Sequence, residues 1–551
     1  MSGSLLTLLN AQMLAAYTAA GYWGDETLYA VAARHARAAP NGFAVRDRHR
    51  RLTYAALIEA ADRLAAILAG RGIRPGQRLA VWLSSRVETA IALLACSRNG
   101  YVCCPSLHRN HTTGEVIALV DRMRAAAVIA DPGFGADADR HDLFGELAGR
   151  DFLRWTHRIG PADVSPFAEL PGDGLEVPAS RDPNQIMYLP FTSGTTGTPK
   201  GVLHSDNTLL ATARMMARDW RLAGAVLYTL SPLSHNLGLG ALVTALAGGG
   251  ELVLHDLPRG HSLVDRLEET GPAFLFGVPT HAIDLLAEMR ARGLRRLGAV
   301  RGFRISGAAA PASLVADLMR HGVTPQSGYG MTETCSHQYT RPDDPPDRII
   351  GSCGRACEGY EVRIWRQDDP DIEAAPGEIG EIGGRGASLM LGYFDDQTAT
   401  EAAFNPAGWF MTGDLGQIDG SGYLRITGCK KDVIIRGGHN IYPAPIEALA
   451  LRHPMVEQAA AIPLPDPRLG ERVCLAIVPT ANAQPDSNEI LRYLAAAGVS
   501  RYDMPEFLLF LAEMPLTASG KIVKRELVRW VTEGRVQPRP VRWEPPAAAE
   551  G

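Results

Sequence analysis

Short apolar segments that alternate with helical segments are the feature that most constrains the fold of this chain. Four of them have the composition of buried strands, namely "RLAVWLSS", "AAAVIAD", "ELVLHD" and "AFLFGVPT". Helical patterns lie between them, and 53–72 is one of these. Leu57, Leu64 and Leu68 share one face of that segment, and a glycine ends it. This alternation predicts an α/β fold with layers of helices and largely buried sheets.

The C-terminal part of the chain has a different pattern. Residues 453–480 read as a short helix followed by two strands around a proline turn, and 487–499 read as another helix. These elements predict a small α+β domain. The last residues, 536–551, are rich in proline and alanine, which predicts a disordered tail. Because 551 residues exceed one ordinary core, two or more domains are expected.

The composition argues against several classes of protein. The chain is 46% hydrophobic and 21% charged, and its formal net charge of -5 gives no indication of nucleic-acid binding. We expect no membrane span, because no run of about 20 apolar residues occurs. The apolar segment 4–23 follows no Lys or Arg, so it predicts an amphipathic helix rather than a signal peptide. Eight cysteines without a CxxC pair indicate reduced, buried thiols in a cytoplasmic protein.

The segment "FTSGTTGTPKGVLHS", 191–205, concentrates glycines, hydroxyls and a lysine in one loop. It differs from a Walker A loop, because Lys200 is followed by Gly201 and a strand-like segment rather than by a helix. The next helix is expected to begin at Ser205, a suitable N-cap. Backbone N–H groups, hydroxyls and a lysine can nevertheless surround an anion. A solvated glycine-rich turn is the alternative.

Six motifs in one order resemble the adenylate-forming enzymes, the superfamily of acyl- and aryl-CoA synthetases, peptide-synthetase adenylation domains and firefly luciferase. The motifs are "TSGTTGTPKG", "SGAAAP", "SGYGMTET", "GWFMTGDLG", "KDVIIRGGHNIYPAPIE" and "PLTASGKIVKREL", and together they cover essentially the whole chain. The resemblance implies that a carboxylate attacks the α-phosphate of ATP, and that a thiol then takes the acyl group from acyl-AMP. It also implies a large N-terminal domain, 1–430, and a small mobile domain, 431–551, which carries the catalytic lysine.

The resemblance assigns the phosphates of ATP to the glycine-rich loop. The residues that would hold the β- and γ-phosphates are Thr192, Ser193, Gly194, Thr195, Thr196, Gly197 and Lys200, with Thr196 among the catalytic residues. Glu333 matches the carboxylate that binds Mg²⁺, which prefers hard oxygen ligands. Without the surrounding motif, Glu333 would be an ordinary acid in the first turn of a helix.

Other matched positions would hold the nucleotide. Tyr329 is expected against the adenine, although alone it would be a core aromatic, and Asp414 is expected to accept both ribose hydroxyls. Thr332 would contact the α-phosphate. The remaining nucleotide positions are Gly307, Ala308, Ala309 and Gly330. One position departs from the family pattern, since Cys429 stands where an arginine is usual. We expect a weaker grip on the nucleotide there, partly compensated by Lys430, Arg425 or Arg436.

The small domain is expected to serve two half-reactions. Lys521 would contact the substrate carboxylate and the α-phosphate during adenylation. Lys431 falls at the hinge position of the family. After the domain rotates, Gly437 and Gly438 would line a channel for the pantetheine thiol. Lys524 is expected to be a solvated surface residue.

The segment around "SHNLGLG" matches the mouth of the acyl pocket in the family. Its candidate pocket residues are His235, Asn236 and Leu237, together with Gly328. The resemblance predicts an acyl-CoA synthetase that uses ATP, Mg²⁺ and coenzyme A on a hydrophobic cyclic, aromatic or medium-chain carboxylic acid. Two alternatives remain, a stand-alone aryl-acid ligase that loads the pantetheine of a carrier protein and a non-catalytic nucleotide-binding relative.

Overall fold

The computed structural model describes residues 9–160, 167, 175, 177–192, 199–258, 260–307, 310–437, 439–481, 483–517 and 521–543. The chain divides into two compact units. Unit 1 comprises Met1–Val362 and Gly384–Phe410, and unit 2 comprises Arg363–Gly383 and Met411–Gly551. The predicted boundary between residues 430 and 431 falls inside unit 2 and remains a prediction.

The first sheet of unit 1 is mostly parallel and has the order β16-β15-β14-β13-β12-β10-β11-β1-β2. Its parallel pairs join β1, β11, β10, β12, β13 and β14, while β2, β15 and β16 are antiparallel additions. The bounds are β1 (Phe43–Arg46), β2 (Arg51–Thr53), β10 (Val226–Thr229), β11 (Glu251–Leu254), β12 (Phe274–Gly277), β13 (Gly302–Ile305), β14 (Thr324–Met331), β15 (Cys335–Tyr339) and β16 (Arg355–Ala356).

The second sheet of unit 1 has the order β19-β9-β7-β4-β3-β5-β6, and β8 pairs with β9. Strands β3 to β7 are parallel neighbours, while β9 is antiparallel to β7, β8 and β19. The bounds are β3 (Arg78–Trp82), β4 (Val102–Cys104), β5 (Ala127–Ala130), β6 (Trp155–Arg158), β7 (Ile186–Tyr188), β8 (Phe191–Thr192), β9 (Lys200–Ser205) and β19 (Gly392–Tyr393).

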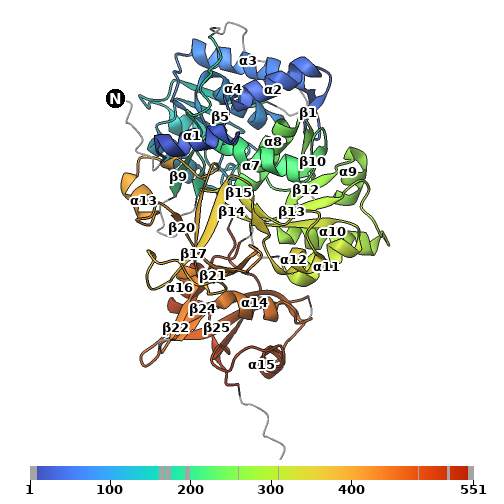
Figure 1. Ribbon diagram of the computed structural model, residues 1–551, viewed down its shortest axis with the longest axis vertical. Helices are drawn as coiled ribbons and strands as arrows, with labels where there is room; N and C mark the ends of the chain where they lie inside the picture. Colours follow the sequence, from blue (N-terminus) through green and yellow to red (C-terminus); the bar gives the residue numbers. More distant parts are fainter. Residues whose placement is uncertain are drawn as a thin grey trace, which may run out of the picture. The chain divides into compact units, whose positions relative to one another are not determined.

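Helices α4 (Val87–Asn99), α7 (Asp206–Asp219) and α8 (Asn236–Gly248) pack between these two sheets (Figure 1). Side chains on nearly all sides of α4 and α8 are buried, as expected for helices covered on both faces. The other helices of unit 1 are α1 (Ala11–Ala19), α2 (Leu28–Ala38), α3 (Tyr54–Gly70), α5 (Thr113–Met123), α6 (Leu143–Leu147), α9 (Leu263–Thr270), α10 (Pro279–Ala291), α11 (Ala312–Arg320), α12 (Pro346–Gly351) and α13 (Gln397–Ala402).

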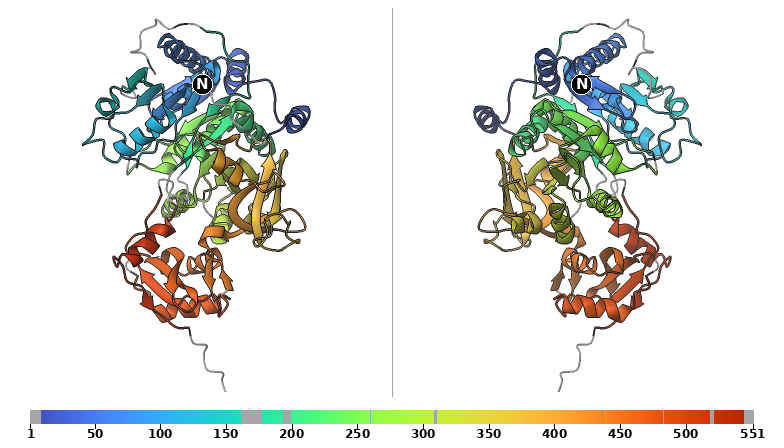
Figure 2. Two further views of the ribbon diagram at one scale, coloured as in Figure 1. Left: turned by 90° about the vertical axis from the view of Figure 1, so that its left-hand side faces the viewer. Right: turned by 90° about the vertical axis from the view of Figure 1, so that its right-hand side faces the viewer.

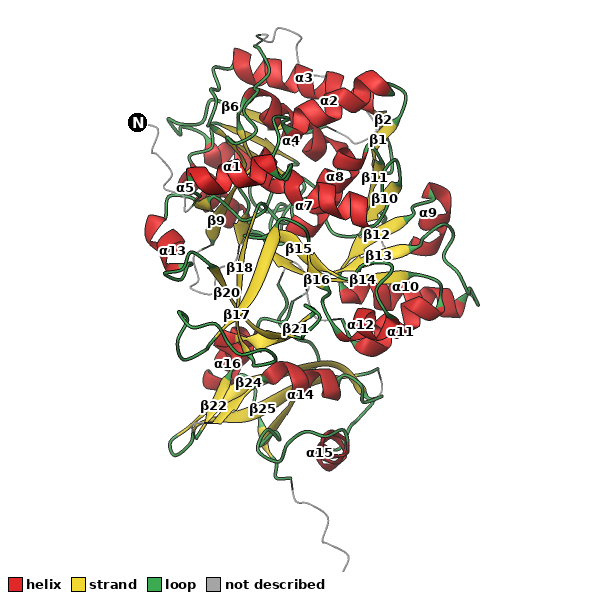
Figure 3. Cartoon of the chain, viewed as in Figure 1, coloured by secondary structure: helices red, strands yellow, loops and turns green. Residues whose placement is uncertain are grey.

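A smaller sheet has the order β17-β18-β20-β21, in which β20 and β21 are antiparallel, with β17 (Tyr360–Trp365), β18 (Gly380–Gly386), β20 (Phe410–Ile418) and β21 (Leu424–Cys429). The last part of unit 2 has its own sheet, β23-β22-β25-β26-β27, to which β24 is joined through β25 (Figure 3). Its elements are η1 (Lys430–Asp432), β22 (Ile434–Arg436), β23 (His439–Ile441), α14 (Pro443–Ala450), β24 (Val456–Asp466), β25 (Gly470–Pro479), α15 (Ser487–Ala496), β26 (Phe507–Phe510), α16 (Lys524–Thr532) and β27 (Arg539–Pro540).

The predicted α/β class is confirmed, with a large N-terminal unit and a smaller C-terminal one (Figure 2). The four predicted buried strands are β3, β5, β11 and β12, and the predicted helix in 53–72 is α3, capped by Thr53. In the part of the chain that the structure describes, no helix is long and apolar enough to cross a membrane.

Two predictions for the C-terminal region are wrong. The expected short helix at the start of 453–480 is absent from these described residues, because β24 begins at Val456 and pairs with β25 along its length. The expected disordered tail is ordered in part, since Arg539 and Pro540 pair with β26 and Trp543 packs on the core. In both places long-range strand pairing overrides local composition.

Candidate active site

The glycine-rich loop is held at its base by a two-strand hairpin. Strand β8 pairs with β9, and Thr192 lies directly opposite Lys200. The helix after β9 begins as predicted, because Ser205 caps α7 and its hydroxyl accepts from the backbone N–H of Thr208 at 3.3 Å. The predicted phosphate residues Ser193, Gly194, Thr195, Thr196 and Gly197 lie outside the described residues.

Tyr393 links the two charged residues predicted for the phosphates and the metal. Its hydroxyl donates to Glu333 Oε1 at 2.9 Å, and Lys200 Nζ lies 4.7 Å from the centre of its ring. Strand β19 places Tyr393 here by pairing it with Val202 of β9. Burial, together with the charge of Glu333, raises the pKa of Tyr393 above its usual range, so it remains a donor. Sequence reasoning missed this residue; its only signal is the "GYF" tripeptide.

The turn between β14 and β15 presents Glu333 and Thr332. The backbone is tightly packed there, because a Cβ on Gly330 would lie 1.9 Å from the carbonyl oxygen of Cys335. His204 Nε2 donates to the Thr332 carbonyl at 2.7 Å, and burial lowers the pKa of His204 to about 4, which keeps it neutral. Tyr329 packs edge-on against His337, with ring centres 5.5 Å apart.

The start of α8 lies beside this turn. His235 is the N-cap of α8, where its Nδ1 accepts from the backbone N–H of Leu237 at 3.2 Å. Asn236 Nδ2 donates to the carbonyl oxygen of Met331 at 3.4 Å. The structure therefore brings the predicted pocket residues of α8 to the strand that carries Gly328 and Gly330.

The segment after β13 carries further predicted site residues. Gly307 has a φ of 91°, a left-handed conformation that favours glycine, and a Cβ there would lie 3.3 Å from Val278. Ala308 and Ala309 lie outside the described residues.

His108 Nδ1 contacts the Ser234 hydroxyl at 3.1 Å, immediately before the cap of α8. Burial, with the neighbouring His111 and His235, lowers the pKa of His108 to about 3. Sequence reasoning did not single out His108.

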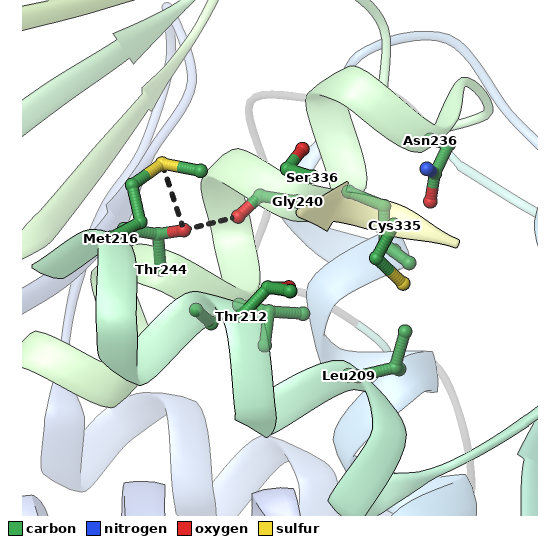
Figure 4. Close-up of a pocket in the computed structure, with 11 residues that line it drawn as sticks. Leu209, Thr212, Met216, Asn236, Gly240, Thr244, Cys335 and Ser336 are labelled. Carbon is green, nitrogen blue, oxygen red and sulfur yellow. Dashed lines mark hydrogen bonds between the residues drawn. The ribbon is translucent and has the colours of Figure 1, made fainter. Parts of the chain in front are cut away.

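A small cavity opens next to Asn236 between α7, α8 and β15 (Figure 4). Its volume is about 20 Å³, which gives room for about one water-sized group. One hydroxyl in its wall is already bonded, because Thr244 donates to the Gly240 carbonyl at 2.7 Å. The lining residues are Leu209, Thr212, Ala213, Met216, Asn236, Leu239, Gly240, Val243, Thr244, Cys335 and Ser336.

Asp414 and Cys429 are directly paired residues on β20 and β21 of unit 2. The Cys429 thiol lies 3.4 Å from the Gly413 carbonyl, to which it donates, and burial raises its pKa. Two of the three cations expected to compensate for the missing arginine already have acidic partners. Lys430 Nζ lies 2.8 Å from Glu381, and Arg436 makes two bonds to Glu506, at 2.8 and 3.0 Å.

Lys521 lies in unit 2 and is exposed. Its backbone N–H donates to the Thr517 hydroxyl at 3.0 Å. The hinge candidate Lys431 is exposed in η1, and Gly437 has a φ of 59°, whereas Gly438 lies outside the described residues.

The expectation for Lys524 as a solvated surface residue is wrong. Its side chain is only 19% exposed, and its Nζ lies 2.7 Å from Glu447 and 3.5 Å from Asp432. The two carboxylates come from α14 and η1, so this contact depends on tertiary packing.

Comparison with known proteins identifies the family. A sequence model described as AMP-binding enzyme matches residues 32–394, and one described as AMP-binding enzyme C-terminal domain matches 445–521. The chain belongs to the AMP-binding enzymes. This AMP-binding enzyme is an acid–thiol ligase that forms an acyl adenylate, so the alternative of a non-catalytic relative is set aside.

Three relatives show how far the similarity extends. The chain is 31% identical to a medium-chain fatty-acid–CoA ligase of Escherichia coli, with 95% of this chain and 94% of the relative covered. It is 33% identical to a salicyl-AMP ligase / salicyl-S-ArCP synthetase of Mycobacterium tuberculosis, with 94% and 93% covered. The ATP-bound structure of MatB from Rhodopseudomonas palustris superposes with a TM-score of 0.81 at 26% identity, covering 92% of this chain and 99% of MatB.

Proposed function

We propose that this AMP-binding enzyme is an ATP-dependent acyl-CoA synthetase for a hydrophobic cyclic, aromatic or medium-chain carboxylic acid, acting in the cytoplasm. The observation that carries the proposal is the mainly apolar cavity beside Asn236, next to the turn that bears Glu333 and Thr332. Because the cavity has a volume of only about 20 Å³, an acid of this size enters only when the side chains of the cavity wall move. Met216 in the wall has the flexibility for such a movement.

The first half-reaction must bring two anions together. Lys200 and the glycine-rich loop would hold the β- and γ-phosphates, and Lys521 would neutralise the attacking carboxylate and the α-phosphate. Tyr393 orients the Glu333 carboxylate, a hard oxygen ligand that fits Mg²⁺. When bound, the metal ion would neutralise charge on the phosphates. Tyr329 would pack on the adenine, and Asp414 would accept the ribose hydroxyls.

The acceptor thiol separates this proposal from its closest alternative. Coenzyme A is the proposed acceptor, as in the Escherichia coli fatty-acid–CoA ligase, whereas the salicyl-AMP ligase / salicyl-S-ArCP synthetase of Mycobacterium tuberculosis favours a carrier protein. Incubation with ATP, a panel of acids and free coenzyme A should give acyl-CoA. Acyl-AMP formation without acyl-CoA, followed by transfer only to an added carrier protein, would contradict the choice of coenzyme A.

The cavity makes a prediction about substrate size. A Cβ on Gly240 would meet nothing within 4 Å, so Gly240→Leu places a side chain in the cavity without a backbone clash. We expect kcat/KM to fall about fivefold or more for the longest acids accepted and to change little for the shortest, since each lost methylene contact costs about 1 kcal/mol. Pyrophosphate exchange across a series of acids measures this.

Gly114→Leu is the matched control for Gly240→Leu, because Gly114 also lies in a helix, is exposed, and has open space around its Cβ position. An equal loss for short and long acids in Gly240→Leu would contradict a role of the cavity in substrate length.

The cysteine at the usual arginine position also leads to a prediction. We expect Cys429→Arg to lower the apparent KM for ATP or to raise the adenylation rate by about 10- to 100-fold, since a charged hydrogen bond contributes about 1.5–3 kcal/mol. Lys430 and Arg436 are already paired with Glu381 and Glu506, so neither of them supplies the hydrogen bond of the missing arginine. Pyrophosphate release as a function of ATP concentration measures the effect.

Cys429→Met fills the same position without a charge and is the control. If Cys429→Arg performs no better than Cys429→Met, another cation already supplies the interaction, and Arg425 becomes the next residue to substitute.

A further inference from the structure

Arg304 is a fully buried cation in the middle of the first sheet of unit 1. Its exposed fraction is 0%, and its Nη1 donates to Gln326 Oε1, 2.6 Å away on the neighbouring strand β14. Among the described residues no carboxylate pairs with Arg304, and its Nε has no hydrogen-bond partner there. The Nε2 of Gln326 is buried without a partner in the same part of the chain.

An arginine in this state is costly, because a buried charge is stable only when it is paired and hydrogen-bonded. The surroundings supply little compensation, since the ring of Tyr339 lies 5.9 Å from the guanidinium carbon. Burial lowers the pKa of Arg304 to about 10, and at that value the side chain remains charged at neutral pH. The structure thus holds a positive charge that no carboxylate of the described residues neutralises.

The guanidinium packs against Gly328, one of the predicted pocket residues. A Cβ on Gly328 would lie 2.6 Å from Nη1 and 2.8 Å from both Cζ and Nη2 of Arg304. A side chain at 328 would therefore displace Arg304, so the glycine leaves the room that the guanidinium occupies. The same strand ends at Met331, whose carbonyl is bonded by Asn236.

The cavity and Arg304 lie on the same side of the sheet. Phe276, which lies directly opposite Arg304 on β12, packs in the same apolar cluster as Leu239 and Cys335 of the cavity wall. Phe303 and Ile305, the residues on either side of Arg304 in β13, pack in the cluster on the other face of the sheet. Gly328 precedes Met331 by three residues, a distance of about 10 Å along an extended strand. A medium-size or aromatic acid has a similar length.

We propose that Arg304 recognises a second carboxylate at the far end of the acid, so that the substrate is a dicarboxylic acid with an apolar body. The inference rests on the proposed function and specifies its substrate class. A guanidinium binds a carboxylate through two parallel hydrogen bonds, and one of them would use the Nε donor that has no partner among the described residues. The apolar cavity wall then contacts the body of the acid.

Matched pairs of acids test this proposal in ATP–pyrophosphate exchange. Hexanoic and adipic acid, octanoic and suberic acid, and 4-methylcinnamic and 4-carboxycinnamic acid differ only at the end that would meet Arg304. We expect the wild type to prefer the dicarboxylic member of at least one pair by about 10- to 100-fold in kcat/KM, the usual effect of a charged hydrogen bond.

Arg304→Met should reverse this preference while retaining exchange with the monocarboxylic acid, since an apolar side chain of similar volume is well tolerated in place of a buried charge. Arg304→Lys should be intermediate, because a lysine lacks the fork of donors. Arg301→Met is the matched control. Arg301 immediately precedes β13, is exposed, and donates to the carbonyls of Trp220 and Arg221.

A second readout does not depend on activity. The dicarboxylic acid should raise the thermal unfolding temperature of the wild type and of Arg301→Met, but not that of Arg304→Met. An unchanged ratio between the two members of each pair in Arg304→Met, with exchange still measurable, overturns this inference alone. Absence of exchange with every acid overturns the proposed function and this inference with it.

Discussion

Lys521→Ala is expected to abolish the formation of acyl-AMP while sparing the formation of thioester from supplied acyl-AMP. The lysine is exposed, next to Ile522, which is bridged to Leu516, and its proposed role belongs only to adenylation. Loss of a cation placed at developing charge costs about 3 kcal/mol or more, which is a hundredfold or greater loss of rate. Pyrophosphate exchange measures the first half-reaction, and thioester formation from synthetic acyl-AMP measures the second.

Arg525→Ala is the matched control, because Arg525 is an exposed cation only four residues away on α16. It should leave both half-reactions close to the wild-type rates. Equal losses in both half-reactions of Lys521→Ala would show that the lysine is not specific to adenylation, and the proposed alternation between two functional states would fail.

Glu333→Gln is expected to slow adenylation by about 100- to 1,000-fold, the range found when a group that stabilises transition-state charge is removed. Glutamine keeps the size of the side chain and can still accept from the Tyr393 hydroxyl, so the change isolates the charge. Pyrophosphate release measured against Mg²⁺ concentration reports the effect, and excess metal should not restore the rate.

Tyr393→Phe separates orientation from charge at the same position. The phenyl ring still packs under Lys200, whereas the hydrogen bond to Glu333 is lost. We expect the adenylation rate to fall about tenfold and higher Mg²⁺ concentrations to restore part of it, because the carboxylate is present but less well oriented.

Full activity of Glu333→Gln at every Mg²⁺ concentration would show that Glu333 is not the metal carboxylate.

Local patterns predicted the elements around the glycine-rich loop correctly. The loop is flanked by two strands, and α7 starts at the Ser205 cap, because both features depend on neighbouring residues. Local patterns failed where distant pairing decides the structure. The alanine-rich start of β24 has no helix because β25 pairs along it. Lys524 is mostly buried because α14 and η1 bring two carboxylates to it.

The sequence by itself determined the family, the α/β class and the positions of the loop, since motifs in a fixed order and the periodicity of apolar residues are properties of short segments. Only the tertiary structure decided that Tyr393 meets Glu333, 60 residues away, and that His108 meets Ser234, 126 residues away. It also decided that Arg304 is buried against Gly328. These contacts depend on the register of strands brought together by folding, and no local pattern encodes that register.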